Sequence, residues 1–204
     1  MNTKKTVPKF ILICVAVLIG LVVFIAGIGL FKKEKPYEPV TIYVGIAVPE
    51  MDLDYLINNS SLIVIGMADK IYPGRWTTPN GKQPNDGEFS EFTIVTDTNF
   101  QVAQVLKGDL NDANIRIRKF GGQAGQDSVI ISAEEIYELD QSYLLFLLED
   151  IGRTSDIEPG HYIAKGGAQG VYKINKDRVI PLFESLDQEW NLDELIAYIE
   201  VSLQ

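Results

Sequence analysis

A single long apolar run dominates the hydrophobic pattern of the chain. Residues 10–31 contain no charged side chain. A helix over this range rises about 33 Å, which is enough to cross a hydrocarbon core of about 30 Å. Within lipid a helix also satisfies its own backbone hydrogen bonds. The pattern therefore predicts one transmembrane helix at 10–31, after a short cytoplasmic tail at 1–9 and before a juxtamembrane linker at 32–39.

The charges that flank this run predict its orientation. Lysines precede it, whereas the lysines that follow are partly offset by Glu34. The positive-inside bias then places the N-terminus in the cytoplasm and residues 40–204 outside the cell membrane, in a single-pass arrangement. Cleavage as a signal peptide stays an alternative, although the run is longer than an h-region and residues 26–29 form a poor cleavage site. Ile13 before Cys14 does not fit a lipoprotein signal.

Beyond the linker, short β-rich runs are separated by turn residues, and two segments have helical spacing. The segments at 73–90 and 121–127 are rich in Gly and read as loops, and 132–138 adds one helical turn. The strand at 142–148 does not alternate, which is typical of a strand buried on both faces. We expect helices at 52–59 and 192–203 and strands at 41–48, 61–72, 91–106, 114–120, 142–148, 161–164, 171–174 and 178–182.

Two strands carry finer expectations. In 91–106 a polar stretch at 96–99 suggests a bulge that curls the sheet. In 114–120 the alternation directs Ile115 and Ile117 inward and Arg116 and Arg118 outward. The fold class that follows is mainly β with flanking helices (α+β): a small five- to six-stranded OB-like barrel over 40–204. An open antiparallel sheet with a covering helix is the alternative.

Composition narrows the function and the location. The formal net charge is −10, and most basic residues near the N-terminus flank the apolar run, so the remaining domain is more acidic still. An acidic domain repels phosphate backbones, which argues against a nucleic-acid partner. The one cysteine, Cys14, lies within the apolar run, so no disulfide staples the domain. This usage fits a bacterial surface protein better than a small secreted animal domain.

Several short motifs carry a resemblance to known families. They are LIVIGMADKI at 62–71, VAQVLKGD at 102–109, IRIRKFGG at 115–122, SYLLFLLED at 142–150 and HYIAKGGAQGVYKI at 161–174. The chain resembles uncharacterised bacterial membrane-anchored surface proteins, and the motif order is similar to the netrin and metalloproteinase-inhibitor type of OB barrel. The resemblance implies a barrel and an extracytoplasmic address. The inhibitors' N-terminal cysteine mechanism does not carry over, because a membrane anchor occupies that region here.

Catalytic motifs are weak in this sequence. A single histidine, His161, excludes sites that need two imidazoles, and no serine lies in G-x-S-x-G. The glycine-rich segments 121–125 and 166–170 lack the Gly-Lys-Ser/Thr ending of a P-loop. The carboxylate pairs at 134–135 and 149–150 have the chemistry to bind a cation or transfer protons, although a solvated face is the commoner reason for such pairs. We predict no catalytic residue, metal or cofactor.

Aromatic residues in or beside loops are the candidate interaction surface, because they bury much area at low entropic cost. Trp76 is the strongest candidate, and Trp190 is expected to pack the last helix. The sequence thus predicts a non-catalytic interaction module for a surface protein, peptide or wall polymer. A carboxylate-based surface hydrolase or transferase and a structural role of the membrane helix are alternatives. The candidate contacts are Trp76, Tyr72, Phe89 and Tyr162.

Overall fold

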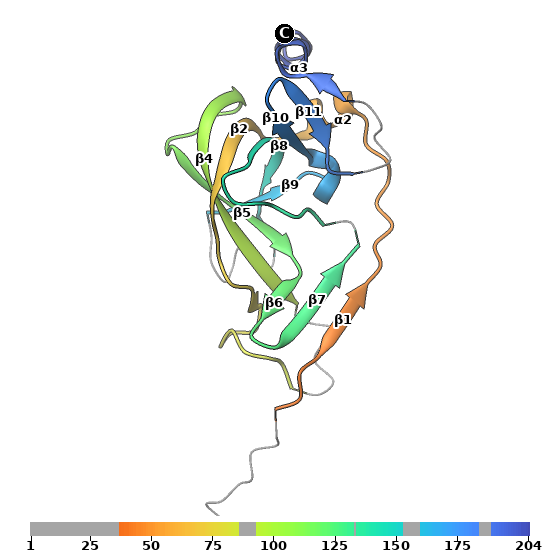
Figure 1. Ribbon diagram of the computed structural model, residues 1–204, viewed down its shortest axis with the longest axis vertical. Coiled ribbons are helices and arrows are strands. Elements are labelled where there is room, and N and C mark those ends of the chain that lie inside the picture. Colours follow the sequence, from red (N-terminus) through yellow and green to blue (C-terminus); the bar gives the residue numbers. More distant parts are fainter. Residues whose placement is uncertain (1–36, 86–92, 133, 153–159, 184–188) are drawn as a thin grey trace, which may run out of the picture. The chain divides into compact units, whose positions relative to one another are not determined.

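The computed structural model describes residues 37–85, 93–132, 134–152, 160–183 and 189–204 (Figure 1). The chain divides into two units, Met1–Glu38 and Pro39–Gln204. The predicted transmembrane helix at 10–31, the tail before it and most of the linker lie outside the described residues. Within the ranges given above, no helix is both long and apolar enough to cross a membrane.

The second unit is built around a closed five-stranded barrel. Its strands are β2 (Leu62–Ile71), β4 (Ile94–Lys107), β5 (Asn114–Phe120), β8 (Ser142–Glu149) and β9 (Tyr162–Ala164). β2 pairs antiparallel with β4 and β8, and β4 pairs antiparallel with β5. β9 closes the ring, antiparallel to β8 and parallel to β5. The prediction of a β barrel with flanking helices is confirmed, and the open-sheet alternative is wrong.

Further strands extend this barrel. β10 (Val171–Asn175) pairs with β8 and continues through β11 (Arg178–Pro181) to β12 (Trp190–Asn191). The short β3 (Arg75–Trp76) pairs with β4, and the 3-10 helix η1 (Gly167–Gly170) precedes β10. A separate three-stranded sheet has the order β1-β7-β6, from β1 (Thr41–Val44), β7 (Asp127–Ile131) and β6 (Gly122–Ala124). In Figure 1 this small sheet lies beside the β4–β5 part of the barrel.

Both predicted helices are present. α2 (Leu53–Asn59) begins after Asp52, whose carboxylate accepts a hydrogen bond from the backbone N–H of Tyr55. α3 (Leu192–Ser202) begins after Asn191, whose side chain caps two N–H groups of the first turn. Such caps satisfy donors that a helix end leaves free. The two helices pack on the outside of β8 and β10 through one core cluster: Leu56, Ile57, Ile63, Leu144, Phe146, Tyr172, Ile174, Val179, Leu195 and Ile199.

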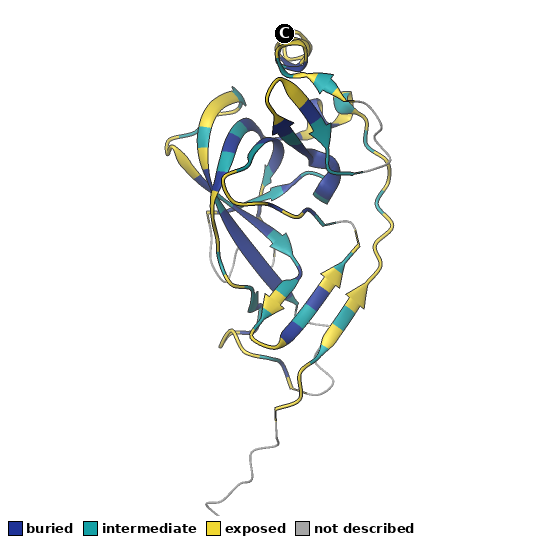
Figure 2. Ribbon diagram, viewed as in Figure 1, coloured by how far each residue is buried: buried dark blue, intermediate teal, exposed yellow. Residues whose placement is uncertain are grey.

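A second cluster fills the barrel interior. Three rings meet edge to face there: Phe100 lies 5.0 Å from Tyr137 and 6.0 Å from Tyr143 between ring centroids, and the two tyrosine rings are 5.4 Å apart. Edge-to-face pairs are favoured by the ring quadrupoles. The aliphatic members are Leu62, Val64, Ala68, Ile115, Ile117, Leu145, Leu147, Ala164 and Val171. β8 contributes to both clusters, which explains why its sequence does not alternate (Figure 2).

The predicted bulge at 96–99 is not where the strand is irregular. β4 pairs with β5 without a shift from Val95 to Gln101. The irregularities lie in the β2–β4 pairing, and the one nearest to the polar stretch inserts Asp69 into β2. Thr96 and Asp97 stay in regular strand because their side chains have buried partners, described below.

Three other expectations need correction. The strand predicted at 41–48 ends at Val44. The loop predicted at 121–127 is largely the β6–β7 hairpin, in which Gly122 has a φ of +121° and a Cβ would overlap Thr96 Oγ1. The glycine-rich composition of 121–127 indicated a loop, because the apolar β7 residues that complete the hairpin come only after the glycines. The described part of 132–138 is not helical. It is an extended segment in which the buried residues Glu135 and Tyr137 alternate with more accessible neighbours.

Candidate functional site

The most unusual chemical feature is an extended segment, residues 134–137, that carries a pair of carboxyl groups. Its side chains alternate: Glu135 and Tyr137 are buried, whereas Glu134 is half-buried and Ile136 is exposed. Period-two alternation is what an extended backbone imposes. The side chains on one side of the segment therefore belong to the core, and those on the other side face a pocket.

The core side places Glu135 against the aromatic cluster. Only 1% of Glu135 is exposed. Its Oε1 accepts a 3.0 Å hydrogen bond from the Tyr137 hydroxyl, and its side chain also shares a hydrogen bond with that of Glu134. The segment is also fixed by its backbone, since the N–H of Glu138 donates to the Tyr143 hydroxyl at 2.9 Å. A carboxyl group buried in this way is costly to ionise.

The other side opens on a pocket of about 290 Å³. β5 supplies Lys119, the β6–β7 hairpin supplies its apolar wall with Val129, and the 134–137 segment supplies Glu134. The ammonium group of Lys119 donates a 3.0 Å hydrogen bond to the backbone oxygen of Glu135. Ile130 and Ile136 also line the pocket and are 48% and 74% exposed. The pocket thus combines a carboxyl group, an ammonium group and exposed aliphatic surface.

The two carboxyl groups perturb one another. Burial, and then repulsion from the neighbouring Glu135, raise the pKa of Glu134 from 4.5 to about 8, against a smaller opposing effect of Lys119. Burial likewise raises the pKa of Glu135. Burial and the adjacent Glu135 raise the pKa of Tyr137 well above its ordinary value, so its hydroxyl stays protonated and donates. The pair therefore retains a proton at neutral pH, and a protonated Glu134 provides an O–H donor beside Glu135.

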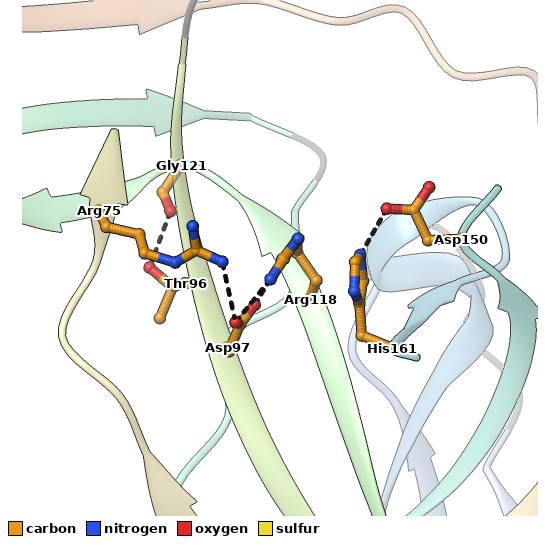
Figure 3. Close-up of polar contacts among 7 residues, drawn as sticks. All are labelled: Arg75, Thr96, Asp97, Arg118, Gly121, Asp150 and His161. Atoms are coloured by element: carbon orange, nitrogen blue, oxygen red, sulfur yellow. Dashed lines mark hydrogen bonds and ion pairs between the residues drawn. The ribbon is translucent and has the colours of Figure 1, made fainter. Parts of the chain in front are cut away.

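A second polar cluster joins β4 to β5 (Figure 3). Arg118 Nε donates to Asp97 Oδ1 at 2.6 Å, and its NH2 group donates to Oδ2 at 2.8 Å. Arg75 approaches the same carboxylate at 3.9 Å. Asp97 and Arg118 are register partners on adjacent strands, and both are buried. Two parallel charge-assisted bonds make a strong clamp between strands. The prediction that Arg118 points to solvent is therefore wrong.

The histidine forms a third polar contact. His161 Nε2 lies 2.5 Å from Asp150 Oδ2, and both side chains are buried (Figure 3). The backbone N–H of Asp150 also donates to the carbonyl of His161 at 3.1 Å. These bonds hold together the two chain positions that follow β8 and precede β9. Glu149 is exposed whereas Asp150 is buried, so this adjacent pair does not converge on one site.

The predicted aromatic contacts lie in different environments. Trp76 is 1% exposed, and its indole N–H donates to Asp127 Oδ2 at 2.9 Å, which contradicts a solvent-facing role. Tyr72 is half-buried beneath the ammonium of Lys70, 4.5 Å from the ring centroid. Tyr162 is half-buried on β9 and packs against the barrel core. Phe89 lies outside the described residues.

Trp190 was expected to pack the last helix, and its ring lies 5.8 Å from that of Tyr198 on α3. The pocket was not predicted as a unit. Its one signal in the sequence is the doublet Glu134-Glu135 directly before Ile136 and Tyr137, which places two acidic residues next to two apolar ones. Lys119 and Val129 join it only through tertiary structure.

Comparison with known proteins gives no family for this chain: no family model matches it, and no curated protein matches it. Among the residues that the structure describes, no group of three or more His, Cys, Asp and Glu side chains is arranged to hold a metal ion.

Proposed function

We propose that the chain is a membrane-anchored, extracytoplasmic interaction module that binds a surface partner at the pocket beside Glu134. The single observation that carries this proposal is the carboxyl group of Glu134 in the pocket wall, with the buried Glu135 behind it. Groups with strongly perturbed pKa values in a concave site are candidates for function. Burying an ionisable group destabilises the folded state, and binding sites are where proteins typically retain such groups.

The rim of the pocket supports binding to another molecule. Ile136 and Ile130 present aliphatic surface to solvent beside the charged groups. Tyr43, the register partner of Ile130 on β1, is 76% exposed and extends this apolar surface over the small sheet. An apolar rim around a few polar groups is typical of recognition sites.

The same geometry favours binding over the carboxylate-based hydrolase or transferase. Two catalytic carboxyl groups must both reach the substrate, and in glycosidases they lie roughly 5–10 Å apart across the scissile bond. Glu135 is almost fully buried behind Glu134. Asp97 is held by Arg118, and Asp150 by His161. These carboxylates are already engaged in holding strands together.

Site-specific photo-crosslinking tests the surface. A photo-reactive amino acid at position 136 of the full chain, in intact bacterial cells, is expected to give a defined adduct. The same group at Val201, which is 69% exposed on α3, serves as the matched control and is expected to give none. Equal labelling from both positions, or none from position 136, contradicts the proposed binding surface.

The membrane address has its own test. Protease added to intact protoplasts is expected to remove the domain at 40–204, since the proposed topology places it outside. Full protection until lysis reverses the topology, and recovery of the intact chain in the soluble fraction without detergent contradicts the anchor.

A further inference from the structure

The charges around the pocket indicate what kind of group fits it. Glu134 lines the pocket, and its carboxyl group shares a hydrogen bond with that of Glu135, which is buried behind it. Lys119 also lines the pocket and directs its Nζ to the backbone oxygen of Glu135. Within the described residues no ion pair joins either carboxyl group to a cation, although such a cation would relieve their mutual repulsion.

The size of the pocket limits the occupant. A volume of about 290 Å³ is at the lower end of the range for small-molecule sites, which is roughly 300–1,000 Å³. Beyond the charged groups, the lining has an aliphatic part, formed by Val129, Ile130, Ile131 and Ile136, and its other members are Phe120, Gly122, Gln123 and Ser128. The pocket thus fits a slender side chain that has an apolar stem and a positively charged end. Lysine has this form, because its methylene stem packs on apolar surface while its ammonium group stays polar.

Resting on the proposed function, we propose that the pocket binds a lysine side chain of a partner polypeptide, with the ammonium group at Glu134 and the stem along Ile130 and Ile136. The ligand's cation takes the place of the proton that the carboxyl pair holds in the free protein. That proton leaves to solvent, so that binding exchanges one positive charge for another within the site.

Proton exchange predicts a pH dependence. In the free protein the pKa of Glu134 is about 8, and the charged groups that act on it are Glu135 and Lys119. At pH 7 the carboxyl is mostly protonated, so binding releases close to one proton per ligand. Affinity therefore rises with pH up to about 8, by as much as about tenfold per pH unit, and then levels off.

The test uses the full chain in detergent micelles and two matched probes, Nα-acetyl-lysine N-methylamide and its neutral norleucine counterpart. Calorimetry in two buffers of different ionisation enthalpy measures affinity and proton release. Methyl NMR of labelled isoleucines reports the place of binding, with Ile130, Ile131 and Ile136 as pocket reporters and Ile199 as the distant control. We expect the lysine probe to bind about 10- to 100-fold more tightly than the norleucine probe.

Two variants sharpen the result. Glu134→Gln removes the charge at nearly constant shape and is expected to abolish both the preference for lysine and the proton release. Glu138→Gln, in the same segment but paired with Lys173 outside the pocket lining, is expected to change neither. Equal affinity of the two probes at the pocket methyls overturns the lysine inference while the binding surface of the proposed function stands. Absence of binding by the lysine probe also overturns the lysine inference. The crosslinking result at position 136 then shows separately whether the proposed binding surface is correct.

Discussion

Replacement of Glu134 by glutamine is expected to stabilise the folded domain, with a gain that depends on pH. Glutamine has the same shape but cannot ionise. The pKa of the Glu134 carboxyl is 4.5 when unfolded and about 8 when folded. Near pH 4 the carboxyl is protonated in both states, so the variant and the wild type are expected to have similar free energies of unfolding.

Between pH 4.5 and 8 the unfolded state ionises and the folded state does not, so wild-type stability falls as pH rises. Each unit of pKa difference corresponds to about 1.4 kcal/mol, which gives about 3 kcal/mol at pH 7. Above pH 8 both states are ionised and the loss is constant. Because the variant also replaces the O–H group that protonated Glu134 presents beside Glu135 with a weaker amide donor, we expect a net gain on the order of 2 kcal/mol at pH 7.

Urea unfolding of the full chain in detergent, at several pH values from 4 to 8.5, measures this difference. Fluorescence of Trp76 is a suitable signal because this side chain is 1% exposed when folded. Comparison of the two proteins at each pH removes the titration of the many other acidic groups. Glu138→Gln, which breaks only an exposed ion pair, is the control and is expected to show no growing difference. Parallel pH profiles of wild type and Glu134→Gln, or a less stable variant at pH 7, would refute the reasoning.

Three further substitutions test the structural assignments by urea unfolding. Asp97→Ala removes the carboxylate that pairs with the buried guanidinium of Arg118 and is expected to cost about 3–5 kcal/mol, most of which a second change, Arg118→Met, restores. Additive losses contradict the clamp. Trp76→Phe removes the indole hydrogen bond to the Oδ2 atom of buried Asp127 and is expected to cost about 1–3 kcal/mol without changing binding of the lysine probe. Asn191→Ala removes a helix cap and is expected to cost about 1 kcal/mol, whereas Asn191→Asp retains most of the stability.

Local signals in the sequence predicted the helices well. Asp52 and Asn191 each precede a segment with apolar residues at helical spacing, and each caps the helix that follows. A cap and its helix are neighbours in the chain, so no knowledge of the fold is needed. The closed barrel followed from β-rich runs and from the disadvantage of exposed strand edges.

Arg118 shows why the residues of the polar clusters could not be predicted from the sequence. Alternation along β5 correctly separated its two faces, with Ile117 in the barrel core. It carried no information on whether the opposite face is covered, and the partner Asp97 is set by the register between β4 and β5. The burial of Trp76 could not be predicted for a similar reason, because its hydrogen-bond partner Asp127 lies far along the chain. Site residues drawn from separate strands are a property of the tertiary fold.

The barrel is joined at one seam by a single register pair, Ile117 with Tyr162, while its other ladders have from three to eight register pairs. Local opening favours such thin ladders. If β9 lifted away, the ring would become a curled sheet with two bare margins, which are templates for pairing with other copies. The contact between His161 and Asp150 holds the start of β9 to the end of β8, so we expect it to oppose this opening. A variant in which the contact between His161 and Asp150 is weakened is expected to aggregate while its helix content is unchanged.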